Sequence, residues 1–157
     1  MKINKKINII YIVASEKDIS GGEKVIYRHS QILNNLFENL SSEIIPLKRN
    51  KFSKYKNSLS KILGKKNQYT GWGVRDIEIK TNHKPKFDFY NTKFRNKFAF
   101  NKNTDFVILP EIFAHLAKEL LIKYKIPYAI FVQNGFALNS TNNYSLLMDA
   151  YKNAKLI

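Results

Sequence analysis

Gly21 and Gly22 form a glycine pair between the apolar run Ile7–Ala14 and an amphipathic segment. The run is rich in β-branched residues, which is typical of a strand buried on both faces. Glycines let another group approach the backbone closely, and these two precede a predicted helix N-terminus, where amide N–H groups point outward. A strand, a glycine turn and a helix N-terminus together form a potential phosphate site. The pair can also be only a tight turn, because it matches neither G-x-G-x-x-G nor the P-loop pattern.

Glu111, Gln133 and Asn134 each come at the end of another apolar run, 106–109 or 128–132. Both runs are typical of buried parallel strands, and open α/β folds bind ligands at the carboxyl ends of such strands. We therefore expect Glu111 at the mouth of the sheet and the two amides at the same edge. An amide offers both a donor and an acceptor, which suits a hydroxyl-rich ligand. The alternative is a capped turn, since Asn and Gly are ordinary turn residues.

The elements that must position these residues alternate along the chain between strands and helices. The patterns predict strands at 7–14, 41–49, 74–80, 106–109 and 128–132, and helices near 21–40, 113–124 and 143–154. Pro46 places the second strand near an edge or shortens its ladder, and 155–157 is expected to begin a further strand. We predict an α/β fold, a Rossmann-like three-layer α/β/α sandwich with a mostly parallel sheet, in which 1–157 form a single domain.

The apolar residues of the first helix recur at three- and four-residue steps and are expected to face the core; they are Val25, Ile26, His29, Ile32, Leu33, Leu36, Phe37 and Leu40. Ser20 and Glu23 have the S-x-x-E spacing of a capping box at the start of this helix. His115 lies off the apolar stripe of the next helix. We expect it at the surface and not as a metal ligand, because no cluster of partner ligands accompanies it.

Composition narrows the class of protein. The chain has 157 residues, 44% of them hydrophobic, which is enough for a real core, and it has no cysteine for disulfides or thiolate metal sites. No run reaches the roughly 18 to 20 apolar residues of a transmembrane helix. The basic N-terminus leads into an apolar run without a clear small-residue cleavage site, so we interpret that run as a strand and not as a signal peptide. A cytoplasmic location is expected.

The net charge of +15, from 27 basic and 12 acidic residues, favours anionic partners. It can equally reflect the lysine-rich composition of a low-GC genome. Residues 48–66 lack acidic side chains and carry apolar residues at helical spacing. They could contact an anionic membrane peripherally, or simply pack an apolar stripe and expose their lysines. Aromatic and basic residues also mix at 84–103, but no known nucleic-acid module is recognisable, so no specific nucleic-acid partner is expected.

Three stretches, IIYIVASEKDISGGEKVIYRHSQIL, DFVILPEIFAHLAKEL and PYAIFVQNGF, occur in this order. The ordered set resembles the amino-terminal half of GT-B glycosyltransferases, in particular the large retaining family called group 1 or family 4. That family pairs two Rossmann-like domains across a cleft, with the acceptor mostly on the first and the nucleotide sugar on the second. The resemblance covers about the first forty and the last fifty-five residues, and the basic middle matches nothing in the family.

The resemblance implies roles for the residues singled out above. Gly21 and Gly22 would approach the donor diphosphate, and Glu111, Gln133 and Asn134 would line the cleft or hold an acceptor hydroxyl. The chemistry would be transfer of a sugar from a nucleotide-diphosphate sugar to a glycan or lipid-linked acceptor. No D-x-D motif is present, as expected for GT-B folds, so we expect no metal and no cofactor. The nucleotide-sugar-binding domain would lie outside 1–157, which alone should not catalyse transfer efficiently.

Two alternatives stay open. The first is a basic Rossmann-like binding module that contacts membrane or nucleic acid without catalysis of its own. The second is one subunit of a split enzyme whose C-terminal donor domain is a separate chain. A nicotinamide dehydrogenase is disfavoured, because the third fingerprint glycine and the acidic residue after the second strand are both missing.

Overall fold

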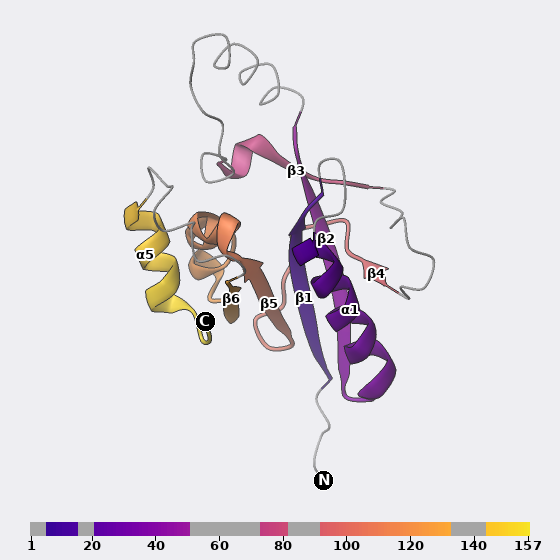
Figure 1. Cartoon of the computed structure of the whole chain (residues 1–157). Coiled ribbons are helices and arrows are strands. Elements are labelled where there is room, and N and C mark those ends of the chain that lie inside the picture. Colours follow the sequence, from indigo (N-terminus) through magenta and orange to yellow (C-terminus); the bar gives the residue numbers. More distant parts are fainter. Residues whose placement is uncertain (1–5, 16–20, 51–72, 82–91, 133–143) are drawn as a thin grey trace.

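The computed structural model describes residues 6–15, 21–50, 73–81, 92–132 and 144–157 (Figure 1). Its strands are β1 (Ile7–Ala14), β2 (Leu40–Arg49), β3 (Ile77–Ile79), β4 (Lys93–Phe94), β5 (Asp105–Pro110) and β6 (Tyr128–Phe131). Its α-helices are α1 (Gly21–Leu36), α3 (Ala117–Leu120) and α5 (Tyr144–Asn153), and its 3₁₀ segments are η2 (Val74–Asp76), η3 (Glu111–Leu116) and η4 (Ile122–Tyr124).

The strands form one mixed sheet in the order β3-β2-β1-β5-β6, with β4 also paired to β2. All pairs are parallel except β2 with β3. β1 pairs with β2 along its whole length, from Ile7 opposite Leu40 to Ala14 opposite Leu47. The α/β class and the mostly parallel sheet are thus as predicted, and β1 has the predicted bounds.

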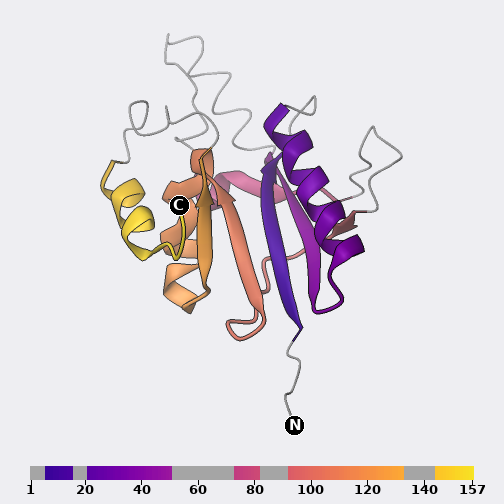
Figure 2. The same cartoon turned by 60° about the horizontal axis from the view of Figure 1, so that its bottom comes forward.

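Both faces of the sheet are buried, which explains the continuous apolar runs of its central strands. On one face Tyr11, Val13 and Ile44 pack with Ile26 and Tyr27 of α1. The other face carries the larger core, to which β1, β2, β5, β6, η3, α3 and α5 contribute. Figure 2 shows α1 alongside β1 and β2, and α5 beyond β6.

The predicted core face of α1 is wrong in part. Leu36 is 71% exposed, and Val25, Ile32 and Phe37 are exposed as well. The helix instead buries Glu23, Ile26, Tyr27 and Ser30. Polar groups can lie on this face because they find partners: Ser42 Oγ donates to Ser30 Oγ at 2.9 Å. The helix also ends at Leu36, so Phe37 lies beyond it and Leu40 already belongs to β2.

Pro46 lies in β2, which is next to the edge strand β3, and this agrees with the predicted position near an edge. It lies between the residues that pair with β4 and those that pair with β3, and its carbonyl accepts from the Lys80 N–H at 2.8 Å. One further expectation is corrected. His115 is buried and not at the surface. Its segment η3 is a 3₁₀ helix with three residues per turn, so its side chains do not follow the α-helical period from which the surface position was predicted.

The end of the described chain agrees with the prediction. Residue Leu156 forms an isolated parallel bridge with Ala129 of β6. The backbone N–H of Ile130 donates to the Leu156 carbonyl at 3.0 Å, and that of Lys155 to the Tyr128 carbonyl at 2.8 Å. Residues 155–156 therefore pair with β6 in the parallel sense.

Candidate functional site

The site lies where the strand order of the sheet reverses: the strands that follow β1 and β5 in the chain are added on opposite sides of this pair. From β1 the chain passes through α1 to β2 on one side, and from β5 it passes through η3 and α3 to β6 on the other. β1 and β5 are neighbours and run parallel, so their carboxyl ends adjoin. In open α/β sheets this switch point is where ligands bind, because the two following connections diverge to opposite faces.

Gly21 and Gly22, the first site predicted from sequence, are the first two residues of α1. Gly21 is exposed, and a Cβ built on it would meet no heavy atom within 4 Å. The first N–H groups of a helix have no intrahelical acceptor, and the helix dipole makes this end positive. An anion could therefore approach the backbone at Gly21. The capping residue predicted at Ser20 lies outside the described residues.

Glu23, the third residue of α1, is buried, so its carboxylate is turned into the protein. Tyr27 Oη, one turn later, donates to Glu23 Oε1 at 3.4 Å. Burial of the phenol and the neighbouring Glu23 carboxylate raise the pKa of Tyr27 well above its usual value. Glu23 thus offsets part of the positive potential inside the first turn, while the Gly21 end stays open to solvent.

Glu111, the second predicted site residue, directly follows β5 and lies at the carboxyl edge as expected. It is only 5% exposed. Tyr151 Oη of α5 donates to Glu111 Oε1 at 2.8 Å. Burial, followed by the hydrogen bond to Glu111 and its charge, raises the pKa of the Tyr151 phenol. Glu111 is therefore held in one orientation by α5, and binding of an acceptor hydroxyl by Glu111 stays a prediction.

Gln133 and Asn134, the remaining predicted site residues, lie outside the described residues. Their strand, β6, ends at Phe131, which is paired with Pro110 of β5. Of the predicted membrane segment 48–66, only the first three residues are described. There Lys48 Nζ lies 3.1 Å from Glu78 Oε1 of β3, so its charge is paired within the sheet.

Sequence reasoning missed Tyr151 and Arg95. The hydroxyl of Tyr151 connects α5 to the end of β5. Arg95 lies at the opposite edge of the sheet, where Nε lies 2.8 Å from Glu43 Oε2 and Nη1 lies 3.0 Å from Asp105 Oδ2. The signal that was available is the pair of acids: Glu43 directly precedes the apolar residues 44–47 of β2, and Asp105 directly precedes the apolar run 106–109 of β5.

Within the described ranges, no group of three or more His, Asp or Glu side chains lies close enough to hold a metal ion. In the same ranges, no helix is long and apolar enough to cross a membrane. Comparisons of the chain with protein-family models, with curated proteins and with solved structures gave no match.

Proposed function

We propose that residues 1–157 are the acceptor-side domain of a GT-B glycosyltransferase, a Rossmann-like half that binds at its switch point. The proposed reaction is transfer of a sugar from a nucleotide-diphosphate sugar to a glycan or lipid-linked acceptor. The observation that carries the proposal is that two sequence-predicted features flank one point of the sheet. The Gly21–Gly22 helix start follows β1, Glu111 follows β5, and β1 and β5 are neighbours.

The roles follow from chemistry. The N–H groups at the start of α1 would face the donor diphosphate, which carries negative charge as the sugar departs. Glu111 would accept a hydrogen bond from an acceptor hydroxyl, and its bond from Tyr151 would fix the carboxylate in place. Gln133 and Asn134 are proposed to extend this edge toward the acceptor. No metal or cofactor is required, because backbone dipoles and basic side chains would stabilise the leaving diphosphate.

The test is binding of a panel of UDP- and GDP-sugars to the chain, measured by isothermal titration calorimetry. UMP and free sugars serve as comparison ligands. We expect Kd values on the order of 1 mM, about −4 kcal/mol, since the other half of the cleft is not supplied. The diphosphate-containing ligands should bind more tightly than the comparison ligands. No sugar transfer is expected from these residues by themselves, and robust turnover would contradict the domain assignment.

The sharpest variant is Gly21→Asp. Space is open at Gly21, and an acidic residue in the first turn stabilises a helix by about 0.3–1 kcal/mol. The variant should therefore fold with an unchanged or higher Tm and still repel the diphosphate, weakening binding at least about tenfold. Ser145→Asp places the same charge in the first turn of α5, at another exposed position, and should leave binding unchanged. Equal effects of the two variants would contradict the proposed site.

The +15 net charge supports a second candidate, the basic binding module or split-enzyme subunit without catalysis of its own. Such a module would bind RNA oligonucleotides or anionic vesicles with steep salt dependence and would not select nucleotide sugars. Nucleotide-sugar binding that survives about 200 mM salt favours the transferase half. Binding to every polyanion that is lost at that salt favours the module.

A further inference from the structure

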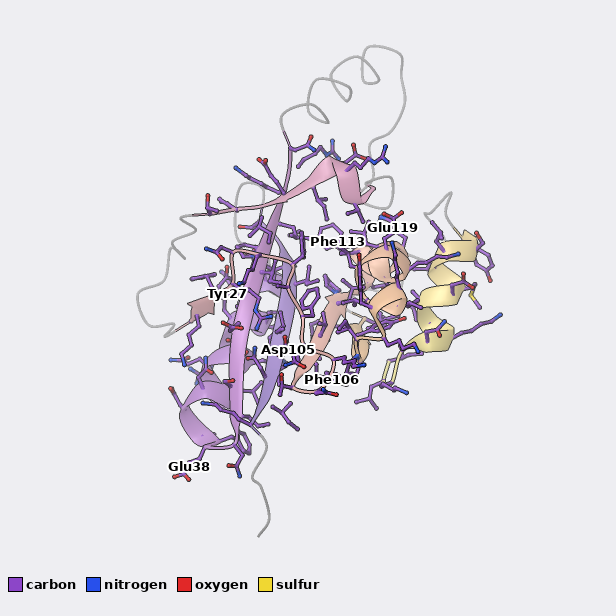
Figure 3. All side chains as sticks on the ribbon, turned by 180° about the vertical axis from the view of Figure 1, so that it is seen from behind. Tyr27, Glu38, Asp105, Phe106, Phe113 and Glu119 are labelled. Atoms are coloured by element: carbon purple, nitrogen blue, oxygen red, sulfur yellow. The ribbon has the colours of Figure 1, made fainter. Side chains whose placement is uncertain are left out.

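A pocket lies on the face of the sheet opposite α1, and neither Gly21 nor Glu111 lines it. Its volume is about 790 Å³, within the range of roughly 300–1,000 Å³ that is usual for small-molecule sites. Three parts of the chain line it: Val74 of η2, the segment 98–102, and the helical segment 119–126. We call it the lateral pocket. Figure 3 views this face and labels Glu119.

The walls of the lateral pocket are apolar and belong to the core. Leu120 and Ile126 are buried, and Phe98 and Phe100 pack against the same core cluster. The two phenylalanine rings lie 6.4 Å apart in a tilted arrangement. These side chains are fixed by core packing, so the pocket is preformed. A ligand therefore does not have to order them on binding, and the entropy cost of binding is lower.

The charged side chains that line the lateral pocket are mostly positive. Lys102 and Lys123 contribute cations, and Glu119 is the single carboxylate among the described residues that line it. Lys123 Nζ lies 5.7 Å from the centroid of the Tyr124 ring. Neither lysine forms an ion pair with another described side chain. An apolar pocket with two such cations is suited to a ligand that is apolar along its body and anionic at one end.

The lateral pocket is separate from the switch point. The segment 98–102 and Ile126 lie at the amino ends of β5 and β6, whereas Val74 precedes β3, which is antiparallel to β2, and so lies near the carboxyl end of β2. Neither Gly21 nor Glu111 lines the pocket. Gly21 and Glu111 lie at the carboxyl ends. A ligand in one site would therefore leave the other accessible.

We propose that the lateral pocket binds an organic anion with an elongated apolar body, a carboxylate on an alkyl chain or on an aromatic ring system. The apolar body lies against Phe98, Phe100 and Leu120, and the anionic group meets Lys102 or Lys123. This inference is independent of the function proposed above, because it uses neither α1 nor Glu111.

Calorimetric titration of the whole chain with octanoate, decanoate and dodecanoate tests the apolar part. Affinity should rise up to about fourfold for each added methylene, the factor that corresponds to about 0.8 kcal/mol of burial. Decanol should bind about two- to fivefold more weakly than decanoate, because it lacks the charge. 1-Naphthoate distinguishes the two classes of ligand. Tighter binding of naphthoate than of decanoate would identify the ligand as an aromatic carboxylate, and tighter binding of decanoate would identify it as an alkyl carboxylate. Failure of every anion to bind overturns the proposal.

Matched variants locate the binding. Ala99 lines the pocket and is exposed, so Ala99→Trp should fill the pocket without disturbing the core and reduce affinity at least about tenfold. Ala99→Ser should keep wild-type affinity. At least one of Lys102→Gln and Lys123→Gln should weaken decanoate binding about two- to fivefold, whereas Lys152→Gln, at an exposed position of α5, should not. Binding that is insensitive to Ala99→Trp, or equally sensitive to Lys152→Gln, places the anion elsewhere and overturns the proposal.

Discussion

Arg95 connects three strands at the amino edge of the sheet, and its removal should be costly. Its side chain is 16% exposed and lies between Glu43 of β2 and Asp105 of β5, whose side chain is 7% exposed. Nη1 also donates to the Ala99 carbonyl at 2.7 Å. Asn8 of β1 joins the cluster, because its Nδ2 donates to Glu43 Oε2 at 2.8 Å. Arg95→Ala therefore leaves two carboxylates without their shared cation.

The magnitude follows from what remains after the change. Breaking a buried ion pair by removing one partner costs about 3–5 kcal/mol. After this change Asp105 still accepts a hydrogen bond from the backbone N–H of Asn101 at 3.0 Å. Glu43 is partly exposed and still accepts one from Asn8. The expected loss is at the lower end, about 3 kcal/mol of unfolding free energy. Arg95→Lys should lose about half of this, because an ammonium does not reproduce the fork of a guanidinium.

The assay is urea unfolding followed by far-ultraviolet circular dichroism. With a denaturant dependence of about 2 kcal/mol/M, a loss of 3 kcal/mol lowers the midpoint by roughly 1.5 M. Arg28→Ala is the matched control: Arg28 is exposed on α1 and donates to Gln31 Oε1 at 3.0 Å, so the change should be within about 0.5 kcal/mol. An Arg95→Ala midpoint close to that of Arg28→Ala would mean that the Arg95 cluster does not stabilise the sheet.

Three shorter predictions follow from burial and hydrogen bonding. Burial, and then the nearby Asp149 carboxylate, raise the pKa of Tyr128 from 10.0 to about 12. As the pH rises, the unfolded chain loses this proton before the folded chain does, so the contribution of Tyr128 to the free energy of unfolding is fully present below about pH 10 and is lost between pH 10 and 12. Thermal unfolding measured as a function of pH tests this. Leu147→Ala, at a position 1% exposed, should cost about 2–5 kcal/mol, whereas Leu36→Ala on the exposed face of α1 should change stability by less than about 0.5 kcal/mol; similar losses in chemical denaturation would contradict the corrected helix face. Tyr151→Phe removes the donor to Glu111 and should lower the free energy of unfolding by about 1–3 kcal/mol. Relative to wild type, amide hydrogen exchange should accelerate more in α5 than in β1; unchanged exchange in α5 would mean that this hydrogen bond does not hold the helix.

β1, β2, β5 and β6 were predictable because their signal is local, whereas the two-residue strand β4 was not predicted. β1 is a near-continuous apolar run between polar segments, and such a run has few alternatives to a buried parallel strand. The position of Glu111 was predictable for the same reason, since it follows a buried run ending at Pro110. The face of α1 was not, because Tyr27 and Ser30 are buried by partners on β4 and β2 that no periodicity in α1 reveals.

Contacts between distant residues account for the rest. The Arg95 cluster joins residues 52 and 10 positions apart, and Tyr151 reaches Glu111 across 40. Each partner by itself is an ordinary polar residue, so only the topology of the sheet brings them together. His115 was misplaced because its segment is a 3₁₀ turn, and the α-helical period does not apply there.

The switch point between β1 and β5 is proposed to bind a diphosphate. Backbone amide chemical-shift mapping on the isotopically labelled chain, titrated with a UDP-sugar, tests this binding residue by residue. We expect the largest shifts at Gly21, Gly22 and Glu23 and at Glu111, with small shifts for residues at the amino ends of the strands. Shifts that are confined to exposed lysines or to the lateral pocket, with the start of α1 unchanged, would contradict it.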